Sequence, residues 1–330
     1  MRRITPAAPS PRFLSRFLDR GRDGREQLLP GPIRGELLGA ERLAESARAL
    51  ASRQHLADPS RRSRGAPLLT RLNGTRLVIA DAQAQLSTAA TGGADPGPAG
   101  EWLLDNYHVV EEHLREVHES LPRGYYRELP ELAGGPLAGY PRVYELATTL
   151  ISHTEARVDL DNVDLFVGAF QEVVPLTIGE LWAIPAMLRL ALLESVRRMA
   201  LQTVQRLEQI EAADRWVERI RAASDGAASE LGIPLGEFMA DPPKLTSHFI
   251  ERFLQQLRRR GAFPALVALE AWIAEEALSA EEAAAKSTQR LAGTQVAMAN
   301  GITSLRAVAR MDWPIFVERQ SRVEAVLRAD

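Results

Sequence analysis

The sequence predicts an all-α protein, a multi-helix array or bundle with one long loop rich in proline, glycine and tyrosine. Apolar residues recur at spacings of three and four along most of the chain, which is the period of an amphipathic helix. The strict alternation of apolar and polar residues that marks a half-buried strand is almost absent. With 330 residues and 45% hydrophobic content, the chain can bury a sizeable core.

Helices are expected wherever this period continues without interruption. Between them lie segments rich in Gly, Pro, Ser and Asp, residues that break helices, at 57–67, 91–100, 121–144 and 224–243. The expected helices cover 36–56, 68–90, 100–120, 142–157, 162–172, 176–224, 244–260, 263–278 and 280–310, with a last one near 313–328.

The segment 224–243 divides the chain into two predicted regions, because a connector of about 20 residues is long for a compact domain. We expect an N-terminal helical bundle over 31–225 and a C-terminal helical region over 240–330. Residues 1–30 are basic but lack the continuous apolar stretch of a secretory signal. They are expected to form a disordered arm.

The most apolar run of the chain, at 178–196, predicts a buried core helix. Its charged residues and Pro185 argue against a membrane span of about 20 apolar residues. Glu180 and Arg189 fall where a charge needs a partner or water. The expected buried stripe consists of Ile178, Leu181, Trp182, Leu188, Leu192 and Val196.

Composition excludes several kinds of site. The net charge of −3 gives no field that would attract nucleic acid, so no nucleic-acid partner is expected. The chain has no cysteine, which excludes disulfides, thiolate zinc sites and cysteine nucleophiles. The sequence contains neither a glycine-rich phosphate loop nor a serine nucleophile elbow. No cofactor is expected.

Three histidines, His108, His113 and His118, recur every five residues within one expected helix. Five residues turn a helix by about 140°, so the imidazoles point in different directions and cannot share one metal ion. Glu112 and Glu116 lie one turn apart and could act as an acid–base pair, although this spacing is usual on a solvated face. No metal ligand and no catalytic residue is assigned.

Several polar residues stand where helices begin. Asp159 and Asp161 have the spacing by which nucleotide-sugar transferases hold a divalent cation, but a helix is expected to follow them. Capping of its N-terminus by one of the aspartates is the favoured interpretation. Thr246 or Ser247 is expected to cap the helix that follows them.

The loop LPRGYYRELPELAGGPLAGYPRVY at 121–144 is the best candidate for a binding site. Tyrosine rings can stack on sugar rings while their hydroxyls and nearby charged groups form hydrogen bonds. The alternative, which is favoured, is that tyrosines and prolines fix the loop against the helices while Gly134, Gly135 and Gly139 supply tight turns. The candidate carbohydrate-binding residues are Arg123, Tyr125, Tyr126, Arg127, Glu128, Tyr140, Arg142 and Tyr144.

Five long segments of the sequence follow one another within about residues 30–330: PIRGELLGAERL (32–43), EWLLDNYHVVEEHLREV (101–117), LPRGYYRELPELAGGPLAGYPRVYELA (121–147), PLTIGELWAIPAMLRLALLE (175–194) and TSLRAVARMDWPIFVERQSRVEAVLRAD (303–330). In this order they resemble the N-terminal helical segment of the bacterial cyclic β-1,2-glucan synthases. The resemblance is specific, because the tyrosine loop and the string PLTIGELWA are long and unusual in composition.

In that family, the resemblance implies, this segment precedes a membrane-embedded glycosyltransferase that uses UDP-glucose, a cyclisation module and a phosphorylase-like module. The transferase signature Gln-x-x-Arg-Trp is not found, since Arg215-Trp216 is preceded by EAAD. No catalytic residue of the family therefore carries over.

The resemblance implies a non-catalytic scaffold or interaction region of a synthase, whose partners are those modules and β-1,2-glucan. It would lie in the cytoplasm, at the inner face of the bacterial inner membrane. The alternative is a self-contained carbohydrate-binding or carbohydrate-active protein that uses the loop at 121–144. Whether the chain is an enzyme stays open at this point.

Overall fold

The computed structural model describes residues 36–58, 67–224, 236–238, 240, 246–260 and 280–321. Within these ranges the regular structure is helical and no β-strand occurs. Two isolated antiparallel bridges, Leu56 with Leu132 and Glu131 with Pro141, are the extended pairings among the described residues. The all-α prediction is confirmed.

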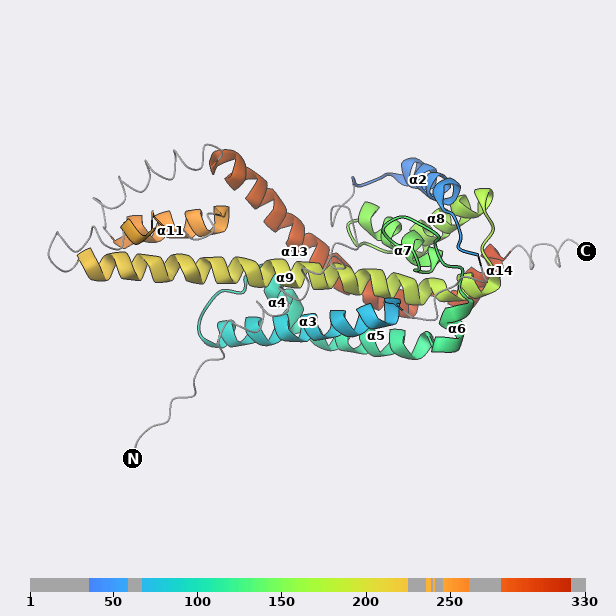
Figure 1. Ribbon diagram of the computed structural model, residues 1–330, viewed down its shortest axis with the longest axis horizontal. Helices are drawn as coiled ribbons and strands as arrows, with labels where there is room; N and C mark the ends of the chain where they lie inside the picture. Colours follow the sequence, from blue (N-terminus) through green and yellow to red (C-terminus); the bar gives the residue numbers. More distant parts are fainter. Residues whose placement is uncertain are drawn as a thin grey trace, which may run out of the picture.

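The long axis of the molecule is α9 (Ile178–Ser224), a helix of 47 residues (Figure 1). At 1.5 Å per residue it extends roughly 70 Å. On one side of it lie α3 (Pro67–Thr91), α4 (Gly97–Asp105) and α5 (Tyr107–Ser120), and α7 (Arg142–His153) packs on its first half.

The remaining helices are arranged around this axis. α2 (Ala40–Arg53) packs on α8 (Leu160–Val173), and α14 (Trp313–Gln320) contacts both α8 and α9. At the other end of α9 its last turns carry α11 (Ser247–Arg260). The long helix α13 (Ala280–Arg310) crosses α9 and also contacts α4 and α5. The expected helix 263–278 and the expected N-terminal arm lie outside the described residues.

Side-chain caps begin several helices, as the sequence predicts. The Asp159 carboxylate accepts a hydrogen bond from the backbone N–H of Asn162 at 2.9 Å, which places Asp159 at the N-cap of α8. The Thr246 hydroxyl accepts from the backbone N–H of Phe249 at 3.3 Å before α11. The expected helix 100–120 is broken into α4 and α5 at Asn106.

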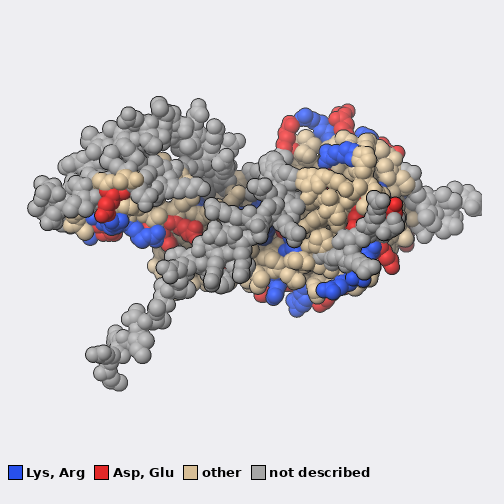
Figure 2. Space-filling model, in the orientation of Figure 1, with Lys and Arg blue, Asp and Glu red and all other residues tan. Residues whose placement is uncertain are grey.

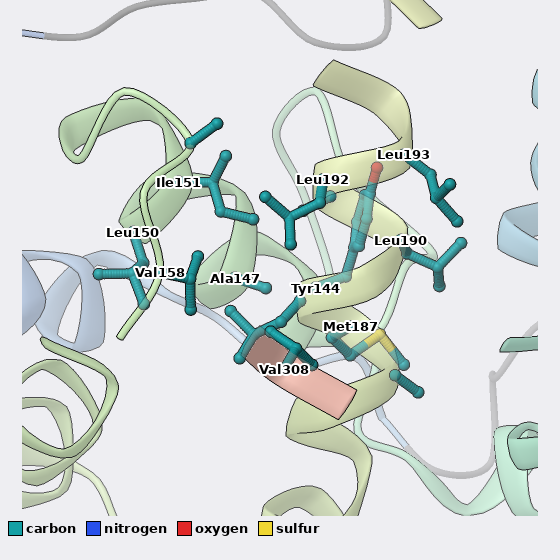
Figure 3. Close-up of a cluster of buried hydrophobic side chains, with 14 of the residues drawn as sticks. Tyr144, Ala147, Leu150, Ile151, Val158, Met187, Leu190, Leu192, Leu193 and Val308 are labelled. Atoms are coloured by element: carbon teal, nitrogen blue, oxygen red, sulfur yellow. The ribbon is translucent and has the colours of Figure 1, made fainter. Parts of the chain in front are cut away.

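Buried side chains form two separate hydrophobic clusters. The first contains residues of α2 to α8, of α9 up to Leu207, and of α13 and α14; Figure 3 shows part of it. The second lies between the last turns of α9 and α11 and consists of Ala213, Val217, Ile220, Phe238, Phe249, Phe253 and Leu257. Residues 297–317 thus pack in the first cluster. The division of the chain into two regions near 224–243 stays a prediction.

The expected buried stripe at the start of α9 is partly wrong. Leu181, Leu188, Leu192 and Val196 are buried, but Ile178 is 52% and Trp182 is 48% exposed. Glu180 is fully buried instead. Two residues turn a helix by about 200°, so burying Glu180 places Ile178 and Trp182 on the opposite side.

Charges are spread over the molecule. On the face drawn in Figure 2, acidic and basic side chains are interspersed among the described residues. None of the described helices is both long and apolar enough to cross a membrane.

Candidate functional site

The tyrosine loop at 121–144 packs into the first hydrophobic cluster. Tyr126, Tyr140 and Tyr144 are buried, and the rings of Tyr140 and Tyr144 stack with centroids 5.8 Å apart. The loop turns back on itself at Gly135 and Gly139, whose φ of +79° favours glycine. Three of the four tyrosine rings of the loop therefore fill the core, as the favoured interpretation expects.

The first part of the loop forms a short helix, α6 (Arg123–Glu128). Arg123, Arg127 and Glu128 are exposed on it, and Tyr125 is half-buried. The Tyr125 hydroxyl donates a hydrogen bond to the carbonyl oxygen of Gly179 at 2.5 Å, which ties α6 to the first turn of α9. Burial raises the pKa of Tyr125 to about 12.

Arg142, the first residue of α7, forms a buried ion pair with Glu180 on α9. Its Nε and Nη2 donate to the two carboxylate oxygens of Glu180 at 2.5 and 2.8 Å, and Nη2 also donates to the Pro175 carbonyl at 2.9 Å. The two side chains are 5% and 0% exposed. The carboxylate and guanidinium planes thus meet in the two-pronged geometry that fixes both partners.

Glu180 also closes the start of α9. Its carboxylate accepts from the backbone N–H of Thr177 at 2.9 Å, while the Thr177 hydroxyl accepts from the backbone N–H of Glu180 at 3.2 Å. This reciprocal arrangement is a capping box. One carboxylate therefore caps α9 and binds it to α7, which is why the sequence places a charge inside the apolar run.

A second buried carboxylate, Glu194, lies four turns further along α9. It accepts from Arg71 at 2.6 Å, from Arg197 at 3.0 Å and from the Thr75 hydroxyl. Burial by itself would raise the pKa of this carboxyl, but the neighbouring guanidinium charges and hydrogen bonds hold it below its usual value. The pair joins α3 to α9.

This second network was not among the candidate residues identified in the sequence. The sequence signal was an acidic residue within the apolar run at 178–196. Arg71 and Glu194 are 123 residues apart, so spacing could not pair them.

The three histidines of α5 point in different directions, as the helical spacing predicts. His113 is buried, whereas His108 and His118 are exposed. The Nδ1 atom of His113 lies 3.1 Å from a carboxylate oxygen of Glu116, and the same oxygen pairs with Nε of Arg189 at 3.0 Å. Burial lowers the pKa of His113. Among the described residues, no group of three or more His, Asp or Glu side chains is arranged to hold a metal ion.

An open pocket of about 460 Å³ lies between the end of α3 and α4. Asp95, Glu101 and Asp105 contribute acidic groups to its lining. The Asp95 carboxylate accepts from the backbone N–H of Gly97 at 2.7 Å, which orders the turn that precedes α4.

The buried carboxylates described above connect helices to one another. Both Glu180 and Glu194 are held by arginines and by threonine hydroxyls, so neither carboxylate is arranged as a general base in an open cleft. Sugar binding by the loop stays a prediction; of its candidate residues, Arg123, Arg127 and Glu128 are exposed and Tyr125 is half-buried.

Comparison with known proteins finds a similar protein of known family. No known protein-family profile matches it. Over 240 residues, 72% of the chain, it is 34% identical to the cyclic beta-(1,2)-glucan synthase NdvB of Rhizobium meliloti (strain 1021). The matched part is 8% of the length of that protein. Over most of its length the chain is therefore similar to a small part of a cyclic β-(1,2)-glucan synthase, as the resemblance of its five segments implies.

Proposed function

We propose that the chain is a non-catalytic scaffold region that holds other modules of a cyclic β-(1,2)-glucan synthase. The observation that carries this proposal is the use of the buried charges. Glu180 and Glu194 each bind α9 to a helix distant in sequence, α7 through Arg142 and α3 through Arg71. Such pairs fix the relative position of helices and leave the carboxylates no proton-transfer role.

The first turns of α9 supply a contact surface for such a module. Ile178 and Trp182 lie one turn apart and are 52% and 48% exposed. Tryptophan is enriched among the residues that contribute most to protein–protein association. Gly179 lies in the same turn of α9 as these two residues, and the half-buried ring of Tyr125 on α6 lies beside it. The exposed surface is therefore continuous with α6.

A complementation experiment tests the scaffold. NdvB lacking the segment that aligns with this chain would be produced alone and together with the chain, and both co-purification and glucan formation from UDP-glucose would be measured. We expect the chain to co-purify and to restore glucan formation, while the chain alone transfers no glucose. Transfer by the isolated chain, or failure to co-purify, would contradict the proposal.

Two variants locate the contact. Trp182→Ala should weaken co-purification at least tenfold, because it removes an exposed aromatic anchor. The matched control is Leu77→Ala on α3, which removes an apolar side chain of similar exposure, 50%, from a different helix. Equal losses from both variants would argue against a contact at Trp182.

The second candidate function is binding of β-1,2-glucan at α6. It is favoured by the exposed Arg123, Arg127 and Glu128 beside the Tyr125 ring, since polar groups around an aromatic face suit a sugar. Titration calorimetry with a β-1,2-linked oligosaccharide tests it. Binding that Tyr125→Ala abolishes and the buried control Tyr126→Phe retains would support this function over the scaffold.

A further inference from the structure

The turn that follows α7 contains two neighbouring residues in the left-handed backbone conformation, although neither is glycine. Glu155 has a φ of +50° and Ala156 a φ of +61°, whereas elsewhere in the described ranges the positive φ angles belong to glycines. The N–H of Ala156 donates to the carbonyl oxygen of Ile151 at 3.1 Å, a bond that ends many helices and ordinarily has glycine at the position of Glu155. A residue with a Cβ is strained in this conformation, which persists only where the surrounding structure holds it.

The surrounding structure that holds the turn is α13. Nδ2 of Asn300 donates to the carbonyl oxygen of Glu155 at 3.1 Å, and the backbone N–H of Val158 donates to the hydroxyl oxygen of Ser304 at 2.8 Å. Asn300 and Ser304 lie one turn apart and therefore contact the turn from the same face of α13. One helix thus supplies a donor and an acceptor to the backbone on either side of the strained residues.

The contact between the turn and α13 is close and buried. Ala156, Val158 and Ser304 are each less than 5% exposed. A Cβ at Gly301 of α13 would lie 4.0 Å from the Cβ of Ala156, so the absence of a side chain at Gly301 lets the turn approach the helix. If α13 moved away, the turn would lose this packing together with both hydrogen bonds, and nothing in the contact would then hold the left-handed residues.

The turn also sets how α7 and α8 are joined. The carbonyl oxygen of His153, the last residue of α7, accepts from the backbone N–H of Leu38 at 3.1 Å, and Asp159, the residue after the turn, caps α8. Figure 3 shows Val158 in the cluster of buried side chains that also contains Val308 of α13. A change in the backbone of residues 154–158 would therefore shift α7 and α8 relative to each other.

We propose that residues 154–158 form a strained turn whose conformation is coupled to the position of α13. The turn is left-handed while α13 is docked, and it relaxes when α13 moves away. The hydrogen bonds of Asn300 and Ser304 offset the strain in the docked state, whereas the relaxation of Glu155 and Ala156 favours the undocked state. Because coupling is reciprocal, relieving the strain must strengthen the docking of α13, and weakening the docking must loosen the turn.

Thiol labelling tests the first direction of this coupling in the full chain, which has no cysteine of its own. Ala297→Cys places a thiol at a buried position of α13, and Ala82→Cys places one at a buried position of α3. Where reclosing is faster than labelling, the rate reports the local opening of each helix. Beside Ala297→Cys, Glu155→Gly should slow labelling about three- to tenfold relative to Glu155→Ala, because glycine relieves the strain and alanine keeps the Cβ.

The comparison of the two thiols separates coupling from a general gain in stability. With Ala82→Cys, the change from Glu155→Ala to Glu155→Gly should slow labelling less than about twofold, because α3 makes none of the contacts with the turn described above. A slowing that is no larger at position 297 than at position 82 would mean that the turn stabilises the chain as a whole, and it would overturn the proposal. Equal labelling of the Glu155→Gly and Glu155→Ala variants at position 297 would overturn it too.

Hydrogen exchange tests the reverse direction. Ser304→Ala removes the acceptor of the Val158 N–H and should accelerate exchange of the Ala156 N–H roughly threefold or more. Ser52→Ala is the matched control, since its exposed hydroxyl donates to the carbonyl oxygen of Arg48 within α2, and it should leave this exchange unchanged. Acceleration by both variants, or by neither, would contradict the coupling.

Discussion

The two ends of α9 are held in different ways. Its first part, 178–207, lies in the large cluster and is crossed by buried ion pairs at Glu180 and Glu194. Its last part, 208–224, is covered by a small aromatic cluster with α11, and its ion pairs are at least partly exposed. A continuous helix thus passes from a site where removing one charge is costly to a site where most charges matter little.

At the second end of α9, packed aromatic rings hold the helices together in place of buried ion pairs. The Phe253 ring stacks on Phe238 and Phe249 with centroids 5.0 and 5.4 Å apart, and Phe238 meets Trp216 edge to face at 5.2 Å. Arg252 and Asp214 form a two-pronged pair at 2.8 and 2.9 Å at its margin. We therefore expect stability there to depend on ring packing, and we expect α11 to unfold more readily than α7, because its cluster is small.

The largest expected effect is at the first end. Arg142→Ala should lower the free energy of unfolding by roughly 3–5 kcal/mol, because it leaves the carboxylate of Glu180 buried without its partner. Urea unfolding followed by tryptophan fluorescence measures this. The control is Arg219→Ala, which breaks an exposed pair with Glu237 and should cost about 1 kcal/mol or less. Equal costs would remove the distinction between the two ends.

The second effect belongs to the aromatic cluster. Phe253→Ala should cost about 3 kcal/mol, as expected for truncating a fully buried ring. The loss should be local: hydrogen exchange should accelerate in α11 while α7 keeps its protection. Uniform acceleration in both helices would mean that the two clusters unfold as one unit.

Alkaline pH should destabilise only the part of the molecule around the first end of α9. All five tyrosines lie between residues 107 and 144, and burial raises the pKa of Tyr125 to about 12 and that of Tyr126 and Tyr144 also above the usual value. The folded state then keeps protons that the unfolded state loses, so this stability is complete below pH 10 and falls as the pH rises through the folded pKa values.

Tyr125 alone should contribute of the order of 1 kcal/mol to this loss, since it is partly exposed and screened. The midpoint of thermal unfolding between pH 9 and 12 measures it, and Tyr125→Phe should make the dependence shallower. A dependence of equal steepness in α11, read by hydrogen exchange, would refute the restriction to the first end.

The smallest effect is expected at Trp182. Trp182→Ala should change the free energy of unfolding by less than about 1 kcal/mol, because the ring is 48% exposed. The neighbouring Leu181→Ala should cost roughly 2–5 kcal/mol, since that side chain is buried. Thermal and urea unfolding of the two variants distinguish them. A large cost at Trp182 would restore the buried stripe that the sequence pattern predicts.

Local patterns were sufficient for most of the described helices and for two of their caps, although the break at Asn106 and the short helix α6 were not predicted. The period of apolar residues fixes a helix because it depends on neighbours three and four positions away, and Asp159 and Thr246 cap the backbone within three residues of themselves. Gly135 and Gly139 likewise occupy positions whose own positive φ angles favour glycine. The resemblance of long segments to the glucan synthases also needed no structure, and the relative confirms it.

Only the tertiary structure decided which side of α9 faces the core at its start. From the sequence, Trp182 is the better candidate for burial and Glu180 the worse, because burying a lone charge is costly. Arg142, 38 residues earlier in the chain, reverses this by meeting the carboxylate with two hydrogen bonds. The pairing of Arg71 with Glu194 could not be predicted from the sequence either, because the two residues are far apart in the chain. The sequence by itself determined most of the helices and the caps at Asp159 and Thr246. The partners of the buried charges, and with them the exposed face at Trp182, depend on contacts between distant residues.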